Sequence, residues 1–282
     1  MFTIRPMTRQ ELPIAIDWAA AEGWNPGLFD AISFHAADPH GFLVGLVGDE
    51  PVATISVVRY GDSFGFLGFY IVRPEHRGKG YGMQIWNAGL ARLEGRSVGL
   101  DGVIAQQDNY RRSGFEFAHD NIRYEGVGGA NAAPDADIVH LSMRRFDEIR
   151  AYDQPFYADA RAAFLKAWLE QPQSTALGIL RNHALAGYGV LRPCRSGFKI
   201  GPLFADSVEL AERLFAALTA CATPGSAIFL DAPAVNAAAI ELAQRHQLTV
   251  AFQTARMYKG MCPELPLNRT ASRVSSSVEV DG

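Results

Sequence analysis

The chain has few cysteines, no long apolar run and no excess of positive charge, and each shortage excludes a class of protein. Cys194, Cys221 and Cys262 are an odd number at wide spacing, so a disulfide framework is not expected. The net charge of −4 gives no general attraction to nucleic acid or to an anionic membrane. No apolar stretch reaches the length of a membrane span, and the N-terminus lacks the basic and apolar segments of a signal peptide. We therefore expect a cytoplasmic protein that binds neither nucleic acid nor membrane.

Histidines are also sparse, and their spacing predicts no metal site. The seven histidines form no H-x-H or H-x-x-x-H pair. Hydrophobic residues make up 48% of the 282 residues and charged residues 20%, which is typical of a soluble globular protein. This length suffices for two domains that each bury a core.

The stretch 64–93 organises the first half of the chain. Residues 64–72 are rich in aromatic and β-branched side chains and end just before Pro74, which predicts a strand. A glycine-rich loop follows at 77–82, and apolar residues then recur near a 3.6-residue period over 83–93, which predicts a helix. Glycines at a helix start let backbone N–H groups converge on an anion, because no Cβ blocks the approach. We therefore expect this loop to bind phosphate.

The spacing of this loop decides which phosphate ligand is expected. A dinucleotide fingerprint and a P-loop both require spacings that the sequence lacks. Arg77, Gly80 and Gly82 fill the pattern R/Q-x-x-G-x-G/A, and residues 72–75 supply the preceding Val-x-Pro-Glu. The stretch resembles the pyrophosphate loop of the GCN5-related N-acetyltransferase (GNAT) superfamily.

The resemblance implies that acetyl-CoA binds as co-substrate, without a metal. We expect acetyl-CoA to contact the end of the strand 64–72, the glycine loop and the following short helix at 106–115. The implied cofactor-binding residues are Tyr70, Ile71, Val72, Arg77, Gly78, Lys79, Gly80, Tyr81, Gly82, Met83, Gln107 and Asn109. Gln107 and Asn109 are included because Val103 stands where common members carry an asparagine that contacts the cofactor.

A second match to the family concerns the catalytic acid. Tyr110 lies four residues before Gly114-Phe115, a spacing found in many GNAT enzymes. A tyrosine of pKa near 10 can protonate a departing coenzyme A thiolate of pKa near 8.5 if the two are in contact. The alternative for Tyr110 is a packed helix side chain. Glu22 is the candidate base, with ordered water as the alternative.

The order of predicted elements gives the fold. Strand, two helices, three strands, helix, strand, helix and strand is the GNAT order, and a looser copy of it follows. We predict an α/β chain of the α+β GNAT type, with two tandem GNAT-like domains and mixed, mostly antiparallel sheets. The expected boundaries are 1–126 for the catalytic domain, 127–138 for a linker, 139–262 for a degenerate GNAT-like domain and 263–282 for a flexible tail.

Acceptor residues are expected in two places. Trp24 and Asp30 belong to the helix-loop-helix that lies over the acceptor site in GNAT folds, although Trp24 can equally pack between two helices. Asp231 and Asn236 stand where a strand yields to a helix in the second half, a usual ligand position in α/β domains. The alternative for Asp231 is a helix cap. The second half lacks a glycine loop, because residues 202–207 read Pro-Leu-Phe-Ala-Asp-Ser, so we expect no second cofactor site.

These expectations define the function predicted from the sequence. We predict an acetyl-CoA-dependent N-acetyltransferase that acetylates the primary amine of a small molecule by direct attack, since no cysteine of the first half can form a covalent intermediate. A non-catalytic acetyl-CoA sensor or scaffold and a protein N-acetyltransferase stay open as alternatives. The sequence leaves the amine and the oligomeric state unknown.

Overall fold

Fourteen strands form one continuous twisted sheet in the computed structural model, which describes residues 1–129, 132–274 and 277–278. The strands are β1 (Phe2–Pro6), β2 (Phe42–Val47), β3 (Glu50–Tyr60), β4 (Phe64–Val72), β5 (Ser97–Val103), β6 (Glu116–Val127), β7 (Ile138–His140), β8 (Thr175–Arg181), β9 (Ala184–Pro193), β10 (Phe198–Ala205), β11 (Ala227–Pro233), β12 (Thr249–Lys259), β13 (Thr270–Ser272) and β14 (Ser277–Val278). The α-helices are α1 (Leu12–Ala21), α2 (Asp30–Ala37), α3 (Tyr81–Arg92), α4 (Gln107–Arg112), α5 (Phe146–Asp153), α6 (Ala162–Leu169), α7 (Val208–Ala220) and α8 (Ala237–Arg245).

The strand order shows how the two halves of the chain are joined. It reads β1-β2-β3-β4-β5-β12-β6-β11-β10-β9-β8-β7, with β13 on β10 and β14 on β5. Within the described residues the parallel pairs are β4–β5, β10–β11 and β5–β14, and the other pairs are antiparallel. The predicted mixed, mostly antiparallel sheet is therefore confirmed.

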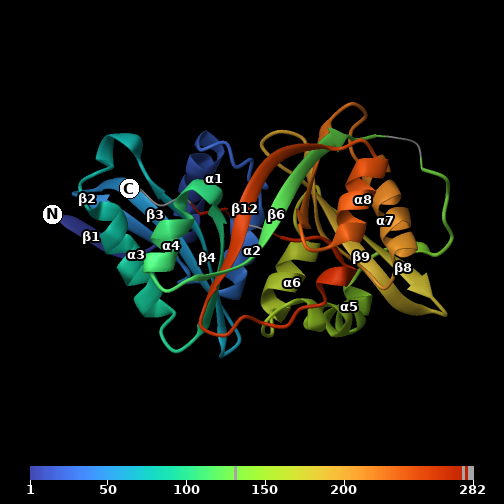
Figure 1. The fold of residues 1–282 in the computed structure, drawn as a ribbon, viewed down its shortest axis with the longest axis horizontal. Helices are drawn as coiled ribbons and strands as arrows, with labels where there is room; N and C mark the ends of the chain where they lie inside the picture. Colours follow the sequence, from blue (N-terminus) through green and yellow to red (C-terminus); the bar gives the residue numbers. More distant parts are fainter. Residues whose placement is uncertain (130–131, 275–276, 279–282) are drawn as a thin grey trace.

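Strands β6 and β12 each pair with strands of the other half of the chain. Strand β12 comes from the C-terminal half but lies between β5 and β6, and β6 comes from the N-terminal half but pairs with β11. Figure 1 shows the two long strands running together through the middle of the molecule. Each half thus completes its sheet with a strand of the other half.

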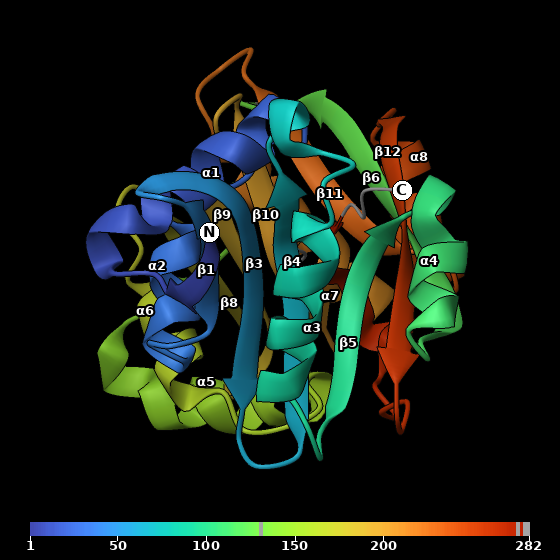
Figure 2. The ribbon, with the colours of Figure 1, turned by 90° about the vertical axis from the view of Figure 1, so that its left-hand side faces the viewer.

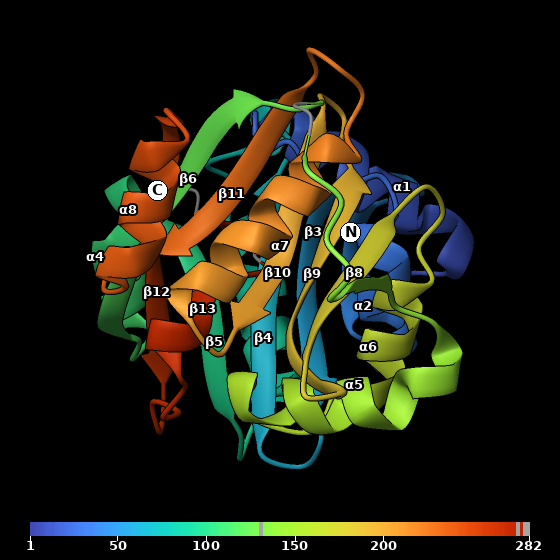
Figure 3. The same cartoon turned by 90° about the vertical axis from the view of Figure 1, so that its right-hand side faces the viewer.

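The helices cover the sheet in three groups. Helices α3 and α4 lie on the outer side of the N-terminal half, as Figure 2 shows, and α7 and α8 lie on the outer side of the C-terminal half, as Figure 3 shows. Helices α1, α2, α5 and α6 lie between the halves, where α2 packs on α6. A core rich in aromatic side chains therefore forms between the two halves.

The structure differs from the sequence-based expectation in two segments. Helix α5 was not expected, and β7 pairs with β8 at the end of the expected linker; residues 130–131 of that linker lie outside the described residues. The domain boundaries stay a proposal.

The expectation of a flexible tail from residue 263 is wrong for the segment around β13. Thr270, Ser272 and Arg273 are buried, and β13 pairs with β10. The Ser272 hydroxyl donates to the Ile200 carbonyl at 2.7 Å, and the Arg273 N–H donates to the Asp231 carbonyl at 2.9 Å. Backbone pairing and the burial of Ala271 in the core fix this mostly polar segment. Residues 275–276 and 279–282 of the expected tail lie outside the described residues.

Candidate active site

Strand β4 separates from β5 halfway along its length. The two strands pair in parallel over residues 64–67 and 97–100, and over the described chain their pairing ends there. Residues 70–72 of β4 therefore lie beyond the paired part of the two strands. We name this place the β4–β5 fork, defined by residues 70–72 of β4 and 101–103 of β5. Strand β14 pairs with Asp101 and Gly102 of β5 and lies beside β4, so it fills part of the fork.

A bulge in β4 accounts for the separation. The register between β3 and β4 shifts so that Ile71 faces Thr54 while Gly68 faces Ser56, which leaves one extra residue on β4. Phe69 adopts a positive φ of 47°, a conformation that is strained for a residue with a Cβ. The Thr54 hydroxyl donates to the Phe69 carbonyl at 2.8 Å and so satisfies the group that the bulge displaces. The bulge turns β4 away from β5.

The glycine loop begins α3 without a side-chain cap. Gly80 is the N-cap residue at φ 78°, and Gly78 has φ 71°, both in the left-handed region that favours glycine. A Cβ built on either residue meets no atom within 4 Å, so the space beside the loop is open. A Cβ on Gly82 would lie 2.5 Å from the Tyr70 hydroxyl, so glycine is required there for close packing of α3 on β4. The first-turn N–H groups of α3 are thus presented to an open space.

Arg77 binds the end of β4 and the end of α1. Its Nε donates to the Val72 carbonyl at 3.0 Å, and its Nη2 donates to Glu22 at 2.7 Å. This ion pair joins the end of α1 to the glycine loop. The Glu22 carboxylate, predicted from the sequence to be the base, is paired here with a permanently charged guanidinium. Its role as the base stays a prediction.

Tyr110 lies beside the fork. Its ring stacks on Trp86 of α3 at 6.0 Å between centroids and packs on Gly102, where a Cβ would lie 2.2 Å from the ring. The side chain is fully buried. Gly102 thus lets the ring of α4 reach the end of β5, so the predicted acid and the fork lie together.

Other predicted cofactor residues have local partners. Gln107 accepts from Arg111 at 2.9 Å, and Asn109 donates to Gln106, so both side chains bond within the segment that contains α4. The Lys79 ammonium donates to the Glu75 carbonyl at 2.9 Å. Tyr81 stacks on Phe2 at 4.6 Å, and Met83 is exposed.

Trp24 and Asp30 lie at the contact between the halves. The Trp24 ring is buried in the hydrophobic core, and its carbonyl accepts from Arg123 at 2.8 Å and from Lys199 at 3.3 Å. Asp30 is buried and accepts from Arg192 at 2.8 and 3.2 Å. Both residues therefore join the two halves, which the sequence did not predict.

Asp231 and Asn236 also have structural partners. Both Asp231 oxygens accept from Arg123 of β6, at 2.6 and 2.9 Å, so Asp231 does not cap the helix. Asn236 caps α8 by accepting from the Ala239 N–H at 3.4 Å, and its amide donates to the Thr270 carbonyl at 2.9 Å. Both side chains are buried and engaged by their own neighbours, and that they face the substrate stays a prediction.

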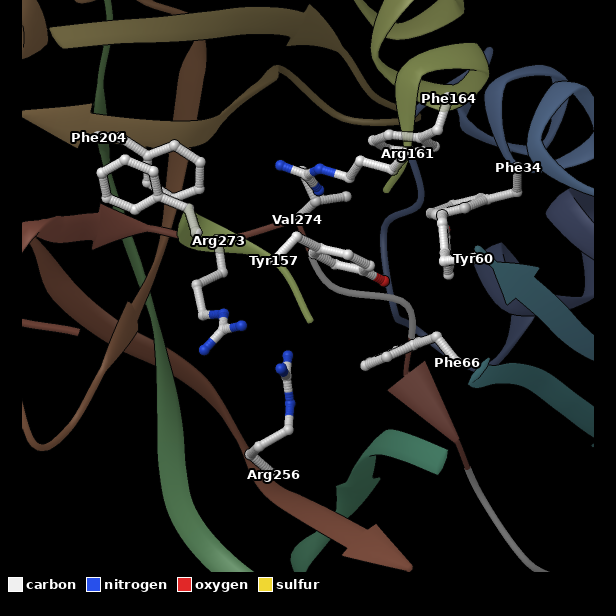
Figure 4. Close-up of a pocket in the computed structure, with 11 residues that line it drawn as sticks. Phe34, Tyr60, Phe66, Tyr157, Arg161, Phe164, Phe204, Arg256, Arg273 and Val274 are labelled. Carbon is white, nitrogen blue, oxygen red and sulfur yellow. The ribbon is translucent and has the colours of Figure 1, made fainter. Parts of the chain in front are cut away.

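A narrow cavity lies between the halves near the inner face of the sheet. The enclosed part of the cavity has a free volume of about 20 Å³, which holds about one water molecule. Together with its mouth, which is open to solvent, the cavity spans about 420 Å³. Figure 4 shows the arginine side chains extending into it among aromatic rings. The lining residues are Phe34, Tyr60, Phe66, Phe156, Tyr157, Arg161, Phe164, Phe204, Arg256, Arg273 and Val274.

Sequence reasoning missed this cavity. Arg256 interrupts the otherwise uncharged run 249–258, and a charge inside a buried strand is a signal that sequence reasoning can use. Arg273 gave no such signal, since it lies in a polar segment that was expected to be a tail.

Two absences hold for the described residues. No group of three or more histidine, cysteine, aspartate or glutamate side chains is placed to hold a metal ion. None of the described helices is long and apolar enough to cross a membrane.

Comparison with family models assigns both halves to one kind of domain. The acetyltransferase (GNAT) family model matches residues 8–115, and the model of an acetyltransferase (GNAT) domain matches residues 149–270. The holothin acyltransferase of Pseudoalteromonas sp. (strain SANK 73390) is 33% identical over 264 residues, which cover 93% of this chain and 90% of that relative.

Solved structures share the fold over the whole chain. A protein from Pyrococcus horikoshii assigned as an acetyltransferase has a TM-score of 0.81 at 20% identity, with 97% of this chain and 94% of that chain covered. A tandem GNAT protein from the clavulanic acid biosynthesis pathway has a TM-score of 0.63 at 12% identity, with 98% and 100% covered. At such identities the likeness concerns the fold alone.

Proposed function

Because this chain belongs to the GNAT acetyltransferase family and is an acyltransferase, we propose that it transfers an acetyl group from acetyl-CoA to the primary amine of a small molecule. The observation that carries the proposal is the β4–β5 fork, which lies beside an uncapped glycine start of α3 and beside Tyr110. Family membership supports acetyl-CoA as the acyl donor.

The N-terminal half is proposed to bind the donor. The first-turn N–H groups of α3 and Arg77 would hold the phosphates, and the β4 backbone beyond its paired part, at residues 70–72, would bind the pantetheine and polarise the thioester carbonyl. Strand β14 occupies the edge of β5 at Asp101 and Gly102, so donor binding there would replace its two-residue pairing. We assign Glu22 to the positioning of Arg77 rather than to proton transfer.

The C-terminal half offers no equivalent donor site. Helix α7 begins at Ser207, whose side chain accepts from the Leu210 N–H at 3.3 Å. This cap satisfies a donor that stays open at the start of α3. One donor site per chain therefore follows from the contrast between the two helix starts.

The bond changes define the task of the site. The neutral amine attacks the thioester carbonyl, a C–N bond forms, the C–S bond breaks, and the thiolate of coenzyme A leaves. The attacking nitrogen loses one proton to ordered water, and this proton restores the Tyr110 hydroxyl after Tyr110 has protonated the thiolate. Tyr110 is proposed to donate its hydroxyl proton to this thiolate. A small acceptor is favoured over a protein because the cavity between the halves is narrow and is lined by both of them.

The experiment is release of coenzyme A thiol over a panel of amines, with Tyr110→Phe as the test variant. The loss of a general acid is expected to lower turnover roughly 10²–10⁴-fold. Acetyl-CoA affinity is expected to change little, because the ring that packs on Trp86 and Gly102 is kept.

Tyr124→Phe is the matched control, since it removes a hydroxyl from another buried ring. Melting temperatures of both variants separate a loss of chemistry from a loss of structure. Unchanged turnover in Tyr110→Phe, measured where chemistry limits the rate, would make Tyr110 a packing residue.

A further inference from the structure

Arg273 is a buried cation that no described carboxylate neutralises. The residue is 7% exposed, and its Nη1 has no hydrogen-bond partner among the described residues. Burial, with repulsion from Arg256 as the next cause, lowers the pKa of Arg273 to about 10, so it is still protonated at neutral pH. An unpaired charge in a protein interior is costly. Its presence therefore calls for an anion that the described side chains do not supply.

The two other arginines of the cavity are already neutralised. Arg161 donates to Asp153 at 2.8 and 2.6 Å, and Arg256 donates to Asp101 at 2.7 and 2.8 Å. Each of these two bidentate ion pairs therefore has no net charge.

His119 adds no charge to the cavity. Burial and the nearby Arg256 and Arg273 lower the pKa of His119 to about 3. The ring is therefore neutral at pH 7, and the described side chains around the cavity carry a net charge of about one positive unit, that of Arg273.

The walls around this charge are mostly aromatic. The Arg256 guanidinium lies 5.0 Å from the Phe66 ring centroid, and that of Arg161 lies 4.3 Å from the Tyr157 ring centroid. Figure 4 shows the guanidinium groups of Arg256 and Arg273 pointing toward one another across the cavity. One unpaired cation among aromatic rings complements a ligand with one anionic group and an apolar body.

The cavity lies next to the proposed reaction site. Asp101, which binds Arg256, precedes Gly102, against which Tyr110 packs. Consecutive residues of a strand point to opposite faces of a sheet. The arginine cavity and Tyr110 are therefore on opposite faces of β5 at the same level of the fork, with the cavity on the side between the halves.

We propose that Arg273, with Arg256 beside it, binds the carboxylate of a small aromatic or apolar acceptor whose body extends into the mouth of the cavity, and that the acceptor amine then lies at the fork. The substrate class is an amine that also carries a carboxylate. This inference rests on the proposed function for the role of the ligand, but the anion site itself is testable without any reaction.

The first test measures binding of phenylacetate to the full chain by calorimetry in the absence of acetyl-CoA. Wild-type protein is expected to bind phenylacetate and to bind the uncharged phenylacetamide much more weakly. Arg273→Met keeps most of the side-chain volume and removes the charge, and it is expected to weaken phenylacetate binding about 10- to 100-fold. Arg273→Lys is expected to restore part of the affinity.

The control is Arg245→Met, which removes an exposed guanidinium that pairs with Glu212. It is expected to leave phenylacetate affinity unchanged. The melting temperature of unliganded Arg273→Met is expected to equal or exceed that of wild type, because a buried unpaired charge is removed. No phenylacetate binding by wild type, or equal binding by wild type and Arg273→Met, would overturn the anion site.

A kinetic comparison links the site to the acceptor. Phenylalanine is expected to have a lower KM than 2-phenylethylamine, which lacks the carboxylate, and Arg273→Met is expected to remove most of that difference. If no amine releases thiol while phenylacetate still binds through Arg273, the proposed reaction fails and the anion site stands. If amines react but phenylacetate does not bind, the anion site fails and the reaction stands.

Discussion

At the scale of single residues, buried charges connect the two halves. Arg123 binds Asp231, Arg192 binds Asp30, and Lys199 lies among them with its ammonium 3.3 Å from the Trp24 carbonyl. Breaking such a pair by removing one partner leaves an uncompensated buried charge, which typically costs about 3–5 kcal/mol. These residues therefore fix the contact between the halves, although the sequence suggested that some of them bind substrate.

Because of Lys199, the free energy of unfolding is expected to change with pH in the alkaline range. Burial, with repulsion from Arg123 as the next cause, lowers its pKa in the folded protein to about 8 from the usual 10.5. Between these two pH values the unfolded chain binds more protons than the folded chain, so this group makes the free energy of unfolding rise with pH. Relative to Lys199→Met, wild type is expected to gain at most about 3 kcal/mol from pH 8 to pH 10.5.

Urea unfolding at several pH values measures this difference. Lys166→Met, at an exposed lysine of α6, is the control and is expected to stay parallel to wild type across the range. A difference between wild type and Lys199→Met that does not change with pH would contradict the prediction.

At the scale of elements, the start of α3 is the part that the proposed function needs most. We expect Gly80→Leu to weaken acetyl-CoA binding at least about tenfold, because the side chain would enter the open space beside the first-turn N–H groups. Calorimetry with acetyl-CoA measures the effect.

Gly95→Leu is a closely matched control. Gly95 has φ 79° and open space around a built Cβ, nearly the same as Gly80 at φ 78°, but it lies outside the loop. Both substitutions are expected to lower the free energy of unfolding by about 1–2 kcal/mol, because a side chain in the left-handed region is strained. Equal acetyl-CoA affinity in the two variants would place the phosphates elsewhere.

At the scale of the whole molecule, the exchange of β6 and β12 makes the halves depend on each other. Within the described residues, β6 pairs with β11 and β12, and neither of these belongs to the N-terminal half. Residues 1–127 alone would leave β6 without a sheet partner and the edge of β5 uncovered, which favours aggregation.

We therefore expect a chain of residues 1–127 to show no cooperative thermal transition. Co-expression with residues 128–282 is expected to restore a soluble complex that unfolds cooperatively, because the missing strands are then supplied. A monomeric 1–127 chain with a sharp transition, seen by circular dichroism, would show that β6 finds another partner.

The sequence by itself determined the strand, the glycine loop and the helix of the stretch 64–93, because their signals are local. The strand 64–72 ends at a proline, the loop 77–82 carries its glycines at fixed spacing, and the apolar period of the next helix follows directly. Each signal lies within about 30 residues, so one reading of the chain finds it. The resemblance to the GNAT family rested on these patterns, and the fold class followed from that resemblance.

Only the tertiary structure decided which distant residues meet. The pairs Glu22–Arg77 and Arg123–Asp231 join positions 55 and 108 residues apart, and no spacing rule predicts them. Strand β12 enters the N-terminal half because its backbone pairs with both β5 and β6 and its Ala255 and Met257 are buried in the core there. Arg273 follows β13, which is held by pairing with β10 and by the buried Ala271, and no local hydrophobic period in the sequence indicates this burial.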